Sequence, residues 1–443
     1  MLPAERRAAF SLALIYMVRM LGLFSILPVF VLFASEFQGS TPFLIGLALG
    51  IYGLLQALLQ IPLGLLSDKI GRKKTIAIGL VLMAVGSIVA ALSESIYGVI
   101  VGRSLQGAGA IAAALMALAA DLSRDEQRTK MMAMLGASIG LSFLLALLLG
   151  PLLISVFSVR MLFWFTAASA GFALIILFYV VPNPERGGFH ADTTARVASL
   201  SELFRRKELQ QLNVSIFFLH LIITATFVVV PVLLQNAGLP SIDHWKVYFP
   251  AVLLSVFAMI ALIFIAERKQ QMRLVLLICV GGLLMTQAVF VWLPGTVAWL
   301  FLGVLMFFCF LNSLEALLPS LVSRIAPAGS RGGANGIYSS CQFFGGFVGG
   351  AGGGWLVGQY GLVAVYLALI GICVVWLLLI RGFKAPKLLS THRRRLNAEE
   401  MQRSDAVLGQ LRQMPGVEEV VLSPEESIAY MKVDKAVFNP AAS

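Results

Sequence analysis

Long runs of apolar residues, separated by short polar turns, recur about twelve times before residue 382. A helix needs on the order of 20 apolar residues to cross a hydrocarbon layer roughly 30 Å thick. In lipid every backbone N–H and C=O group has to be paired within the protein, and a helix pairs them along its own length. The runs therefore predict an all-α membrane protein with twelve transmembrane helices.

The composition agrees with a protein whose surface is largely in contact with lipid. Hydrophobic residues make up 59% of the chain and charged residues 12%, which is about half the charged share of a typical soluble domain. The first run, 10–33, has no small-residue cleavage site and is followed at once by further runs. It is therefore predicted to be the first transmembrane helix and not a removed signal peptide.

The net charge of +11 is distributed unevenly between the two sets of turns. Bases gather in alternate turns, whereas the other turns are short and carry few charges. Clusters of Lys and Arg occupy 69–74, 124–130, 186–207, 268–273, 324–331 and 381–395. Positively charged turns stay on the cytoplasmic side, so both termini are predicted to be cytoplasmic and no nucleic-acid partner is expected.

Polar stretches divide the chain into four predicted regions. These are a six-helix half at 1–182, a cytoplasmic linker at 183–208, a second six-helix half at 209–382 and a soluble tail at 383–443. The predicted helices lie near 9–34, 43–66, 73–93, 96–121, 130–154, 160–182, 210–236, 246–267, 272–293, 296–322, 332–357 and 362–381.

The two halves repeat one another at a constant offset of 203 residues. This offset pairs Pro28 with Pro231, Leu115 with Leu318, Arg128 with Arg331 and Gly150 with Gly353. Four matches in one register indicate a duplication. Two pseudo-symmetric halves form the architecture in which an alternating-access pathway lies between them.

Glycines recur every four residues in the helix predicted at 332–357, in a first ladder at Gly345, Gly349 and Gly353 and a second at Gly346, Gly350 and Gly354. The offset carries the first ladder onto Ser142, Ala146 and Gly150 in the first half. Small residues let helix backbones approach closely in lipid. The ladders indicate either static packing or surfaces on which helices slide and rock.

The tail after residue 387 has a different composition and no apolar run of spanning length. Its patterns predict a helix near 399–413, a strand at 417–423, a turn at 423–426 and a strand at 427–433. We therefore expect a small α+β appendage on the cytoplasmic side.

The turn GLLSDKIGRKKT between the second and third helices carries the most specific motif. Gly64, Asp68, Gly71, Arg72 and Lys73 match the GxLxDrxGrkxxl signature, and the chain resembles the major facilitator superfamily of transporters. The bases alone could serve as a topological anchor, but an anchor needs no acid. The motif therefore favours a conformational latch.

The resemblance implies that Asp68 braces the start of the helix at 332–357 while Arg72 pairs with Asp121. The corresponding turn in the second half, AERKQQMR, keeps Glu267 but lacks the glycine and the aspartate. A latch in the first half alone is therefore expected.

Two further motifs resemble those of the superfamily. The segment GRSLQGAGA contains Arg103 and Gln106 and is similar to the RxxQGxG pattern that is linked to proton coupling. Arg103 is expected either to face a cavity or to extend to the nearby outer interface.

The helix predicted at 130–154 ends in Gly150-Pro151, with Gly136 and Gly140 upstream. It resembles the glycine-proline motif of the drug:proton antiporter branch, although leucines replace the usual glycines after the proline.

Three ionisable residues lie within predicted spans, namely Arg19, His220 and Glu315, and Asn312 is one turn from Glu315. Desolvation favours the neutral form of a carboxyl group, so an acid and a histidine could exchange protons along a pathway. The alternative is a structural ion pair of Glu315 with Arg19 or His220.

The sequence favours neither an enzyme nor a cofactor. Cys279, Cys309, Cys341 and Cys373 lie inside apolar runs without the spacing of a metal or redox site, and there is no GxxxxGK[ST] phosphate loop. No metal and no cofactor are expected.

The resemblance covers nearly the whole chain and predicts a secondary transporter of the bacterial inner membrane that moves a small solute by alternating access. Proton-coupled efflux by a monomer is expected, with protons, a small-molecule substrate and the lipid bilayer as partners. A facilitated uniporter and a transporter-like receptor that signals through its tail are the alternatives. The tail resembles part of a ferredoxin-like domain, with HRRRLN in the place of its first strand and its last elements absent.

Overall fold

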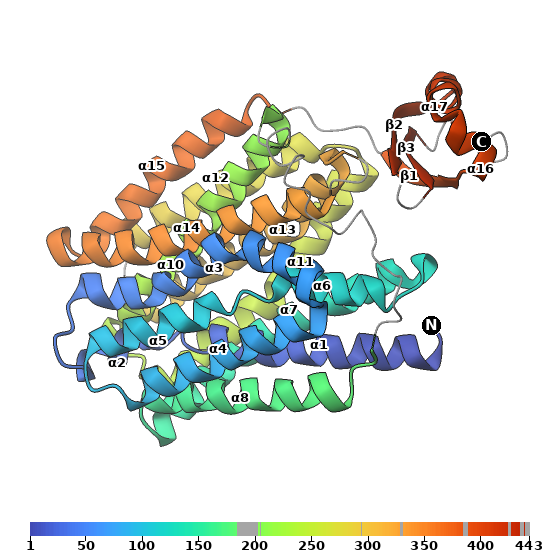
Figure 1. Ribbon diagram of the computed structural model, residues 1–443. Coiled ribbons are helices and arrows are strands. Elements are labelled where there is room, and N and C mark those ends of the chain that lie inside the picture. The colour runs from blue at the N-terminus through green and yellow to red at the C-terminus, as the bar shows by residue number, and fades with distance from the viewer. Residues whose placement is uncertain are drawn as a thin grey trace.

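The computed structural model describes residues 1–183, 205–293, 295–327, 331–383, 389–423 and 427–434, together with Leu203 and Phe438. Long helices form one bundle, and a small domain with strands lies beyond one end of it (Figure 1). That end also carries the N terminus, and we call it the near side; the opposite end is the far side. Most of the predicted linker and the predicted turn at 423–426 fall outside the described residues.

The first half of the bundle is built from eight α-helices, two of them short. They are α1 (Pro3–Phe24), α2 (Phe30–Phe33), α3 (Pro42–Ile70), α4 (Arg72–Leu92), α5 (Ile96–Ala108), α6 (Ala112–Asp121), α7 (Asp125–Val156) and α8 (Arg160–Tyr179), with the 3-10 turn η1 (Ala34–Glu36) before α3.

The second half follows the same plan. It contains α10 (Lys207–Asn236), α11 (Trp245–Arg268), α12 (Met272–Trp292), α13 (Val297–Ile325), α14 (Arg331–Tyr360) and α15 (Leu362–Ile380), with the 3-10 turn η2 (Ser241–Asp243) before α11.

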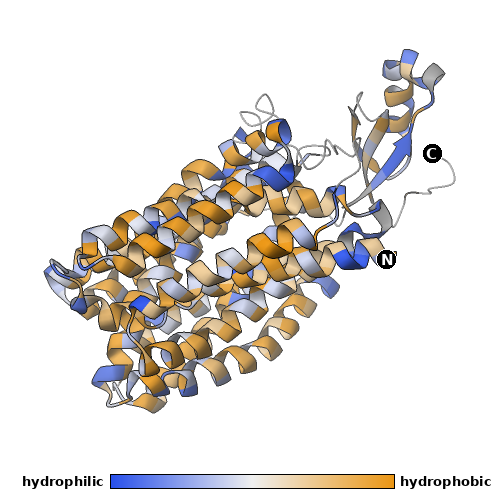
Figure 2. Ribbon diagram, turned by 60° about the horizontal axis from the view of Figure 1, so that its bottom comes forward, coloured by the Kyte–Doolittle hydropathy of each residue, from blue (hydrophilic) through white to orange (hydrophobic). Residues whose placement is uncertain are grey.

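Eleven segments of the described chain are long and apolar enough to cross a membrane, with α5 and α6 forming one of them. The 30-residue helix α14 is not one of these eleven segments, because its many glycines lower its hydropathy, but it packs against α3 and α10 within the bundle. Large apolar side chains such as Phe178, Phe257 and Leu378 are exposed, and apolar residues cover the length of the bundle (Figure 2). The predicted fold of a polytopic helical membrane protein is confirmed.

Two predicted helices are interrupted. The helix expected at 9–34 ends at Phe24 in the structure, shortly before Pro28, which has no N–H group for a helical hydrogen bond. The helix expected at 96–121 is broken between Ala108 and Ala112, where the Ile111 N–H donates to the Gly109 carbonyl at 2.9 Å. Both predictions of a continuous helix were wrong.

The packing of the two halves follows the repeat in the sequence. A Cβ atom added to Gly150 in α7 would lie 2.5 Å from the Ser25 carbonyl oxygen next to α1. A Cβ atom added to Gly353 in α14 would lie 3.3 Å from Ala225 and 3.7 Å from Val228 in α10. Ser25 and Val228 are themselves related by the offset of 203, so the same contact occurs in each half.

Helix α14 carries two glycine ladders with different neighbours. Gly345, Gly349 and Gly353 approach α10 of the same half. Gly350 and Gly354 approach Gly46 of α3, in the other half. The first ladder therefore packs within the second half, whereas the second ladder joins the two halves.

The appendage is a three-stranded antiparallel sheet in the order β1-β3-β2 with two helices. Its elements are β1 (Leu389–Arg395), α16 (Ala398–Gln402), α17 (Ser404–Gln413), β2 (Val417–Ser423) and β3 (Ile428–Asp434). Leu411, Val420 and Met431 are buried in its own core.

The two predicted strands of the appendage match β2 and β3. The helix predicted at 399–413 is instead divided into α16 and α17. The polar strand β1 completes the sheet through pairing with β3, as in the register of His392 with Met431. Its partner is an element distant in sequence, and this is why local apolar patterning gives little sign of it.

Candidate functional site

The charged turn on the near side joins three helices. Gly71 has a φ of 100°, a left-handed conformation that favours glycine, and it separates α3 from α4. Arg72 follows it, is 5% exposed, and forms ion pairs with Asp68 and, at 3.3 Å, with Asp121 at the end of α6. The structure therefore brings Asp68, Arg72 and Asp121 together.

Other residues of this turn hold it in place. The Arg72 guanidinium donates to Ser67 Oγ at 2.7 Å, and Ser67 Oγ donates to the Gly64 carbonyl at 2.6 Å. Lys73 Nζ donates to the Val181 carbonyl at 2.6 Å and so ties α4 to the end of α8.

Among the described residues, Arg72 is the polar partner of Asp68. Residues 328–330, which precede α14, lie outside the described part of the chain. The bracing of α14 by Asp68 therefore stays a prediction.

The second half also has an ion pair on the near side. Arg324 near the end of α13 lies 2.5 Å from Glu267 near the end of α11. Arg324 is 203 residues after Asp121, so a base stands where the first half has an acid. The expectation of a latch in the first half alone stays a prediction. The sequence analysis did not single out Arg324, although the offset itself could have identified it.

Arg103 lies inside the first half and is 2% exposed. Its Nε donates to the Ala48 carbonyl at 3.1 Å, and its two terminal nitrogens donate to Gln106 Oε1 at 2.9 Å and to the Leu49 carbonyl at 3.3 Å. Gln106 in turn donates to Ser87 Oγ at 2.8 Å. Arg103 therefore does not extend to the outer interface, because backbone carbonyls of α3 satisfy it within the protein.

Arg19 of α1 is 1% exposed and contacts Tyr52 of α3. One terminal nitrogen, Nη2, donates to Tyr52 Oη at 2.9 Å, to Gln56 Oε1 at 3.0 Å and to the Gly109 carbonyl at 3.4 Å. The alternative that Arg19 pairs with Glu315 is therefore wrong.

Glu315 of α13 belongs to a polar cluster inside the second half. Its Oε1 lies 3.5 Å from His220 Nε2 of α10, and the same nitrogen lies 2.8 Å from Gln342 Nε2 of α14. The Glu315 side chain is 35% exposed and that of His220 is 19% exposed. Asn312, one turn earlier, instead donates to Ser255 Oγ of α11 at 2.7 Å. The structure brings Glu315 and His220 together, whereas Asn312 lies at the contact between α13 and α11.

Helix α7 contacts the second half at Phe143 but not at the two glycines that lie nearer the near side. Phe143 of α7 lies 5.8 Å from Phe308 and 6.5 Å from Phe227, both of the second half, and 5.2 Å from Phe24 of its own half. Gly140 and Gly136 lie one and two turns nearer the near side on the same face. Both are exposed, with no neighbouring atom within 4 Å of the Cβ that a substitution would add.

Sequence reasoning did not identify Phe143 or the polar residues Tyr52, Gln56 and Gln60. Gln56 and Gln60 are 0% and 3% exposed. Two glutamines four residues apart in an otherwise apolar span were an available signal, because such a pair lies on one helix face. Phe143 had no signal, since phenylalanines are common throughout these spans.

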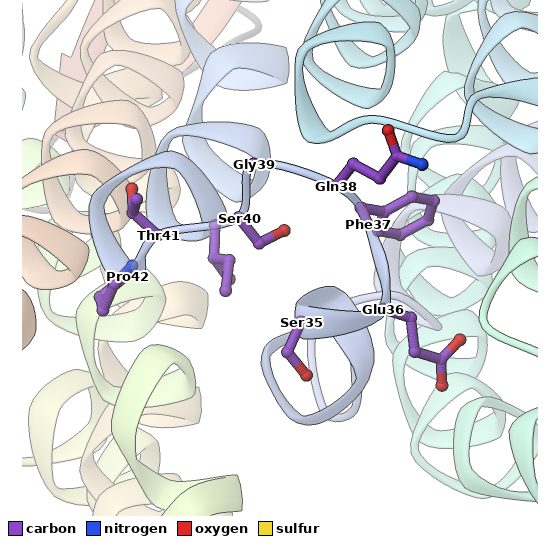
Figure 3. A pocket seen from close by; sticks show the side chains of 9 residues that line it. Ser35, Glu36, Phe37, Gln38, Gly39, Ser40, Thr41 and Pro42 are labelled. Atoms are coloured by element: carbon purple, nitrogen blue, oxygen red, sulfur yellow. The ribbon is translucent and has the colours of Figure 1, made fainter.

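A surface pocket of about 570 Å³ lies on the far side, in the segment that connects α2 to α3 (Figure 3). Its lining includes Glu36, Gln38 and Thr41, and none of the site residues predicted from the sequence. Within the described residues, no three His, Cys, Asp or Glu side chains gather where they could hold a metal ion.

The model of the Major Facilitator Superfamily matches residues 12–318. The chain is 42% identical to the inner membrane transport protein YajR of Escherichia coli (strain K12), over 99% of this chain and 96% of that protein. It is 34% identical to an uncharacterized transporter of Buchnera aphidicola subsp. Acyrthosiphon pisum, over 78% of this chain and 89% of that protein.

Solved structures of transporters share the fold. A bacterial homolog of the human lysosomal transporter Spinster, in an inward-facing and occupied conformation, has a TM-score of 0.71 at 14% identity and covers 86% of this chain and 97% of its own. A D-xylose-proton symporter has a TM-score of 0.69 at 18% identity and covers 86% of this chain and 98% of its own. These matches agree with the two-half architecture, and the chain belongs to the Major Facilitator Superfamily of membrane transporters.

Proposed function

We propose that this transporter moves a small solute by alternating access and exchanges it for protons, with Glu315 as the group that carries the proton. Efflux from the cytoplasm is the proposed direction, and the near side is proposed to face the cytoplasm because bases cluster there. The contact of Glu315 with His220 inside the bundle is the observation that supports this proposal most strongly.

A carboxylate inside a membrane protein is costly unless it is paired or protonated. Glu315 has a histidine and, through it, a glutamine as neighbours, and part of its side chain remains accessible. Such a group can hold a proton when its surroundings are dry and release it when water enters. Alternate opening of the bundle to the two sides would supply these two environments.

The contacts of α7 support alternating access. The halves touch at Phe143 and are not in contact at Gly140 and Gly136. Because these three residues share one helix face, this difference supports an interface between the halves that is closed at mid-depth and open toward the near side. The reciprocal state, which an exchanger must also reach, would reverse this difference.

Proton movement in proteoliposomes tests the proposal. Vesicles that contain a pH-sensitive dye and the wild-type protein are challenged with lipophilic and metabolic compounds. We expect compound-dependent proton movement, and we expect Glu315→Gln to abolish it because the amide cannot bind and release a proton. Glu94→Gln, an exposed carboxylate on the far side, is the matched control and should behave as wild type.

Each other outcome contradicts part of the proposal. Solute movement without proton movement, equal in wild type and Glu315→Gln, would indicate a facilitated uniporter. No movement of any solute, with compounds changing only the conformation of the soluble appendage, would indicate a receptor.

A further inference from the structure

Arg19 carries an unpaired positive charge inside the first half. It is 1% exposed, and its three hydrogen-bond acceptors are neutral: a phenol, an amide and a backbone carbonyl. All three bonds use Nη2, and the buried Nε and Nη1 have no partner. No carboxylate of the described residues lies within ion-pair distance of it.

This arrangement is costly for the protein on its own. A buried charge without a counter-charge loses its hydration, and a buried donor without an acceptor adds to the loss. Charged groups of this kind inside membrane proteins usually mark a substrate or ion pathway. The two unused donors of Arg19 therefore call for an acceptor that the protein does not supply.

A second unpaired donor lies beside Arg19. Gln56 of α3 accepts from Arg19 through Oε1, while its buried Nε2 has no partner. Gln60, one turn along α3, is also buried and has no partner for its Oε1. Arg19 and Gln56 together thus offer N–H groups from two helices at one place.

The break between α5 and α6 lies at the same place. Arg19 Nη2 donates to the carbonyl of Gly109, which belongs to the break, and α6 begins three residues later. The start of a helix presents unpaired N–H groups and a partial positive charge. In transporters, interrupted helices bring such groups to the depth of the substrate.

We propose that Arg19 and Gln56 bind an oxyanion group, a carboxylate or phosphate, of the transported solute beside the start of α6. This inference rests on the proposed function and names its substrate class. Nε and Nη1 lie on different edges of the planar guanidinium, and either one can donate a charge-assisted hydrogen bond to an oxygen of such a group. Arg103, whose donors are already used, adds positive potential from over the Tyr52 ring, 5.1 Å from its centroid.

Binding to the purified full-length protein tests this proposal. The probes are benzoate and phenylphosphonate, with benzamide and benzylamine as neutral and cationic analogues, all at equal ionic strength. Thermal unfolding is followed for the wild type, Arg19→Gln, Arg19→Lys and Gln56→Leu. Arg160→Gln, an exposed base on the far side, is the control.

We expect the two anions to raise the unfolding temperature of the wild type and the control. Binding should weaken by about tenfold or more in Arg19→Gln and Gln56→Leu. It should weaken less in Arg19→Lys, which keeps the positive charge but lacks the planar set of N–H donors. Without ligand, Arg19→Gln should unfold at the same or a higher temperature, because an uncompensated charge is removed.

The proposal is overturned if neither anion stabilises the wild type, if both stabilise the Arg19 and Gln56 variants equally well, or if only the neutral or cationic analogue stabilises the protein. Should Arg19→Gln fail to fold, Arg19→Lys and Gln56→Leu decide the result. Compound-dependent proton movement that depends on Glu315 would survive a negative result here, so the two proposals fail separately.

Discussion

Each half has an ion-paired cluster at helix ends on the near side, and the acid Asp121 of the first half corresponds to the base Arg324 of the second. In the first half Arg72 lies between Asp68 and Asp121, and in the second half Glu267 pairs with Arg324. Partly buried interactions of this kind contribute up to about 2 kcal/mol at a helix end. Such a term biases an equilibrium between conformers without locking it.

Asp68→Asn is expected to favour the conformer that is open on the near side. The substitution keeps the size of the side chain but removes its charge, so the opposite conformer loses the brace that the family resemblance assigns to Asp68. Distances between spin labels on the two halves, measured on the near side, should shift toward the longer population by a factor of up to about ten.

Two further variants accompany this measurement. Glu267→Gln should shift the distances in the same direction, and the double variant should shift them further if the two clusters act independently. Asp243→Asn, on the far side, serves as the control. Unchanged distance distributions in all variants would contradict a latch at either place.

Helix packing depends on glycines only where the backbones of two helices meet. A Cβ atom on Gly50 of α3 would lie 2.6 Å from the Phe347 carbonyl oxygen of α14, whereas one on Gly171 of α8 would meet nothing within 4 Å. Gly50→Leu should therefore destabilise the bundle by about 1–3 kcal/mol, and Gly171→Leu by less than about 0.5 kcal/mol. Thermal unfolding in detergent compares the two, and equal unfolding temperatures would contradict this view of the contact.

The aromatic contact between the halves leads to a prediction about proton leak through the bundle. Phe143 packs against Phe227 and Phe308 across the interface, and each aromatic pair contributes about 0.5–1.5 kcal/mol beyond its buried area. Phe143→Ala should therefore loosen the mid-depth closure and allow proton movement without added compound. Phe178→Ala, an exposed ring on α8, is the control. If Phe143→Ala allows no more proton movement than the wild type, the Phe143 ring does not contribute to the closure between the halves.

The elements differ in how well the sequence predicts them. Long apolar runs identify the spans because burial in lipid is decided by each run alone. The break near Gly109 was missed because it depends on neighbours distant in sequence, such as Arg19. The break near Pro28 was missed although the proline itself was a local signal. Local patterning gave no sign of β1, which pairs with β3, and only the family resemblance pointed to a strand at HRRRLN. The motif identified Arg72, and a charge within an apolar span identified Glu315, but neither signal identified the buried glutamines of α3 or Phe143.

The whole molecule combines a membrane bundle with an appendage that has its own core. Leu411, Val420 and Met431 are buried among residues of the appendage. Truncation after Lys387 should therefore leave a folded bundle with an unfolding temperature close to that of the full chain. Size-exclusion chromatography in detergent checks this, and loss of monodisperse protein would mean that the appendage supports the bundle. The division at 182, 208 and 382 remains our proposal for the boundaries of the parts.

The contact between α3 and α14 runs from Pro42 and Gly354 on the far side to Ile61 and Gly336 toward the near side. The two halves are in contact along α3 and α14 and separate toward the near end of α7, and this arrangement is typical of a hinge. In the proposed alternating-access cycle, displacement would grow with distance from α3 and α14, so a small rotation about these helices would open a wide gap at the near end of α7. The glycines of α3 and α14 would then define the rotation axis, while the solute would pass where the displacement is largest.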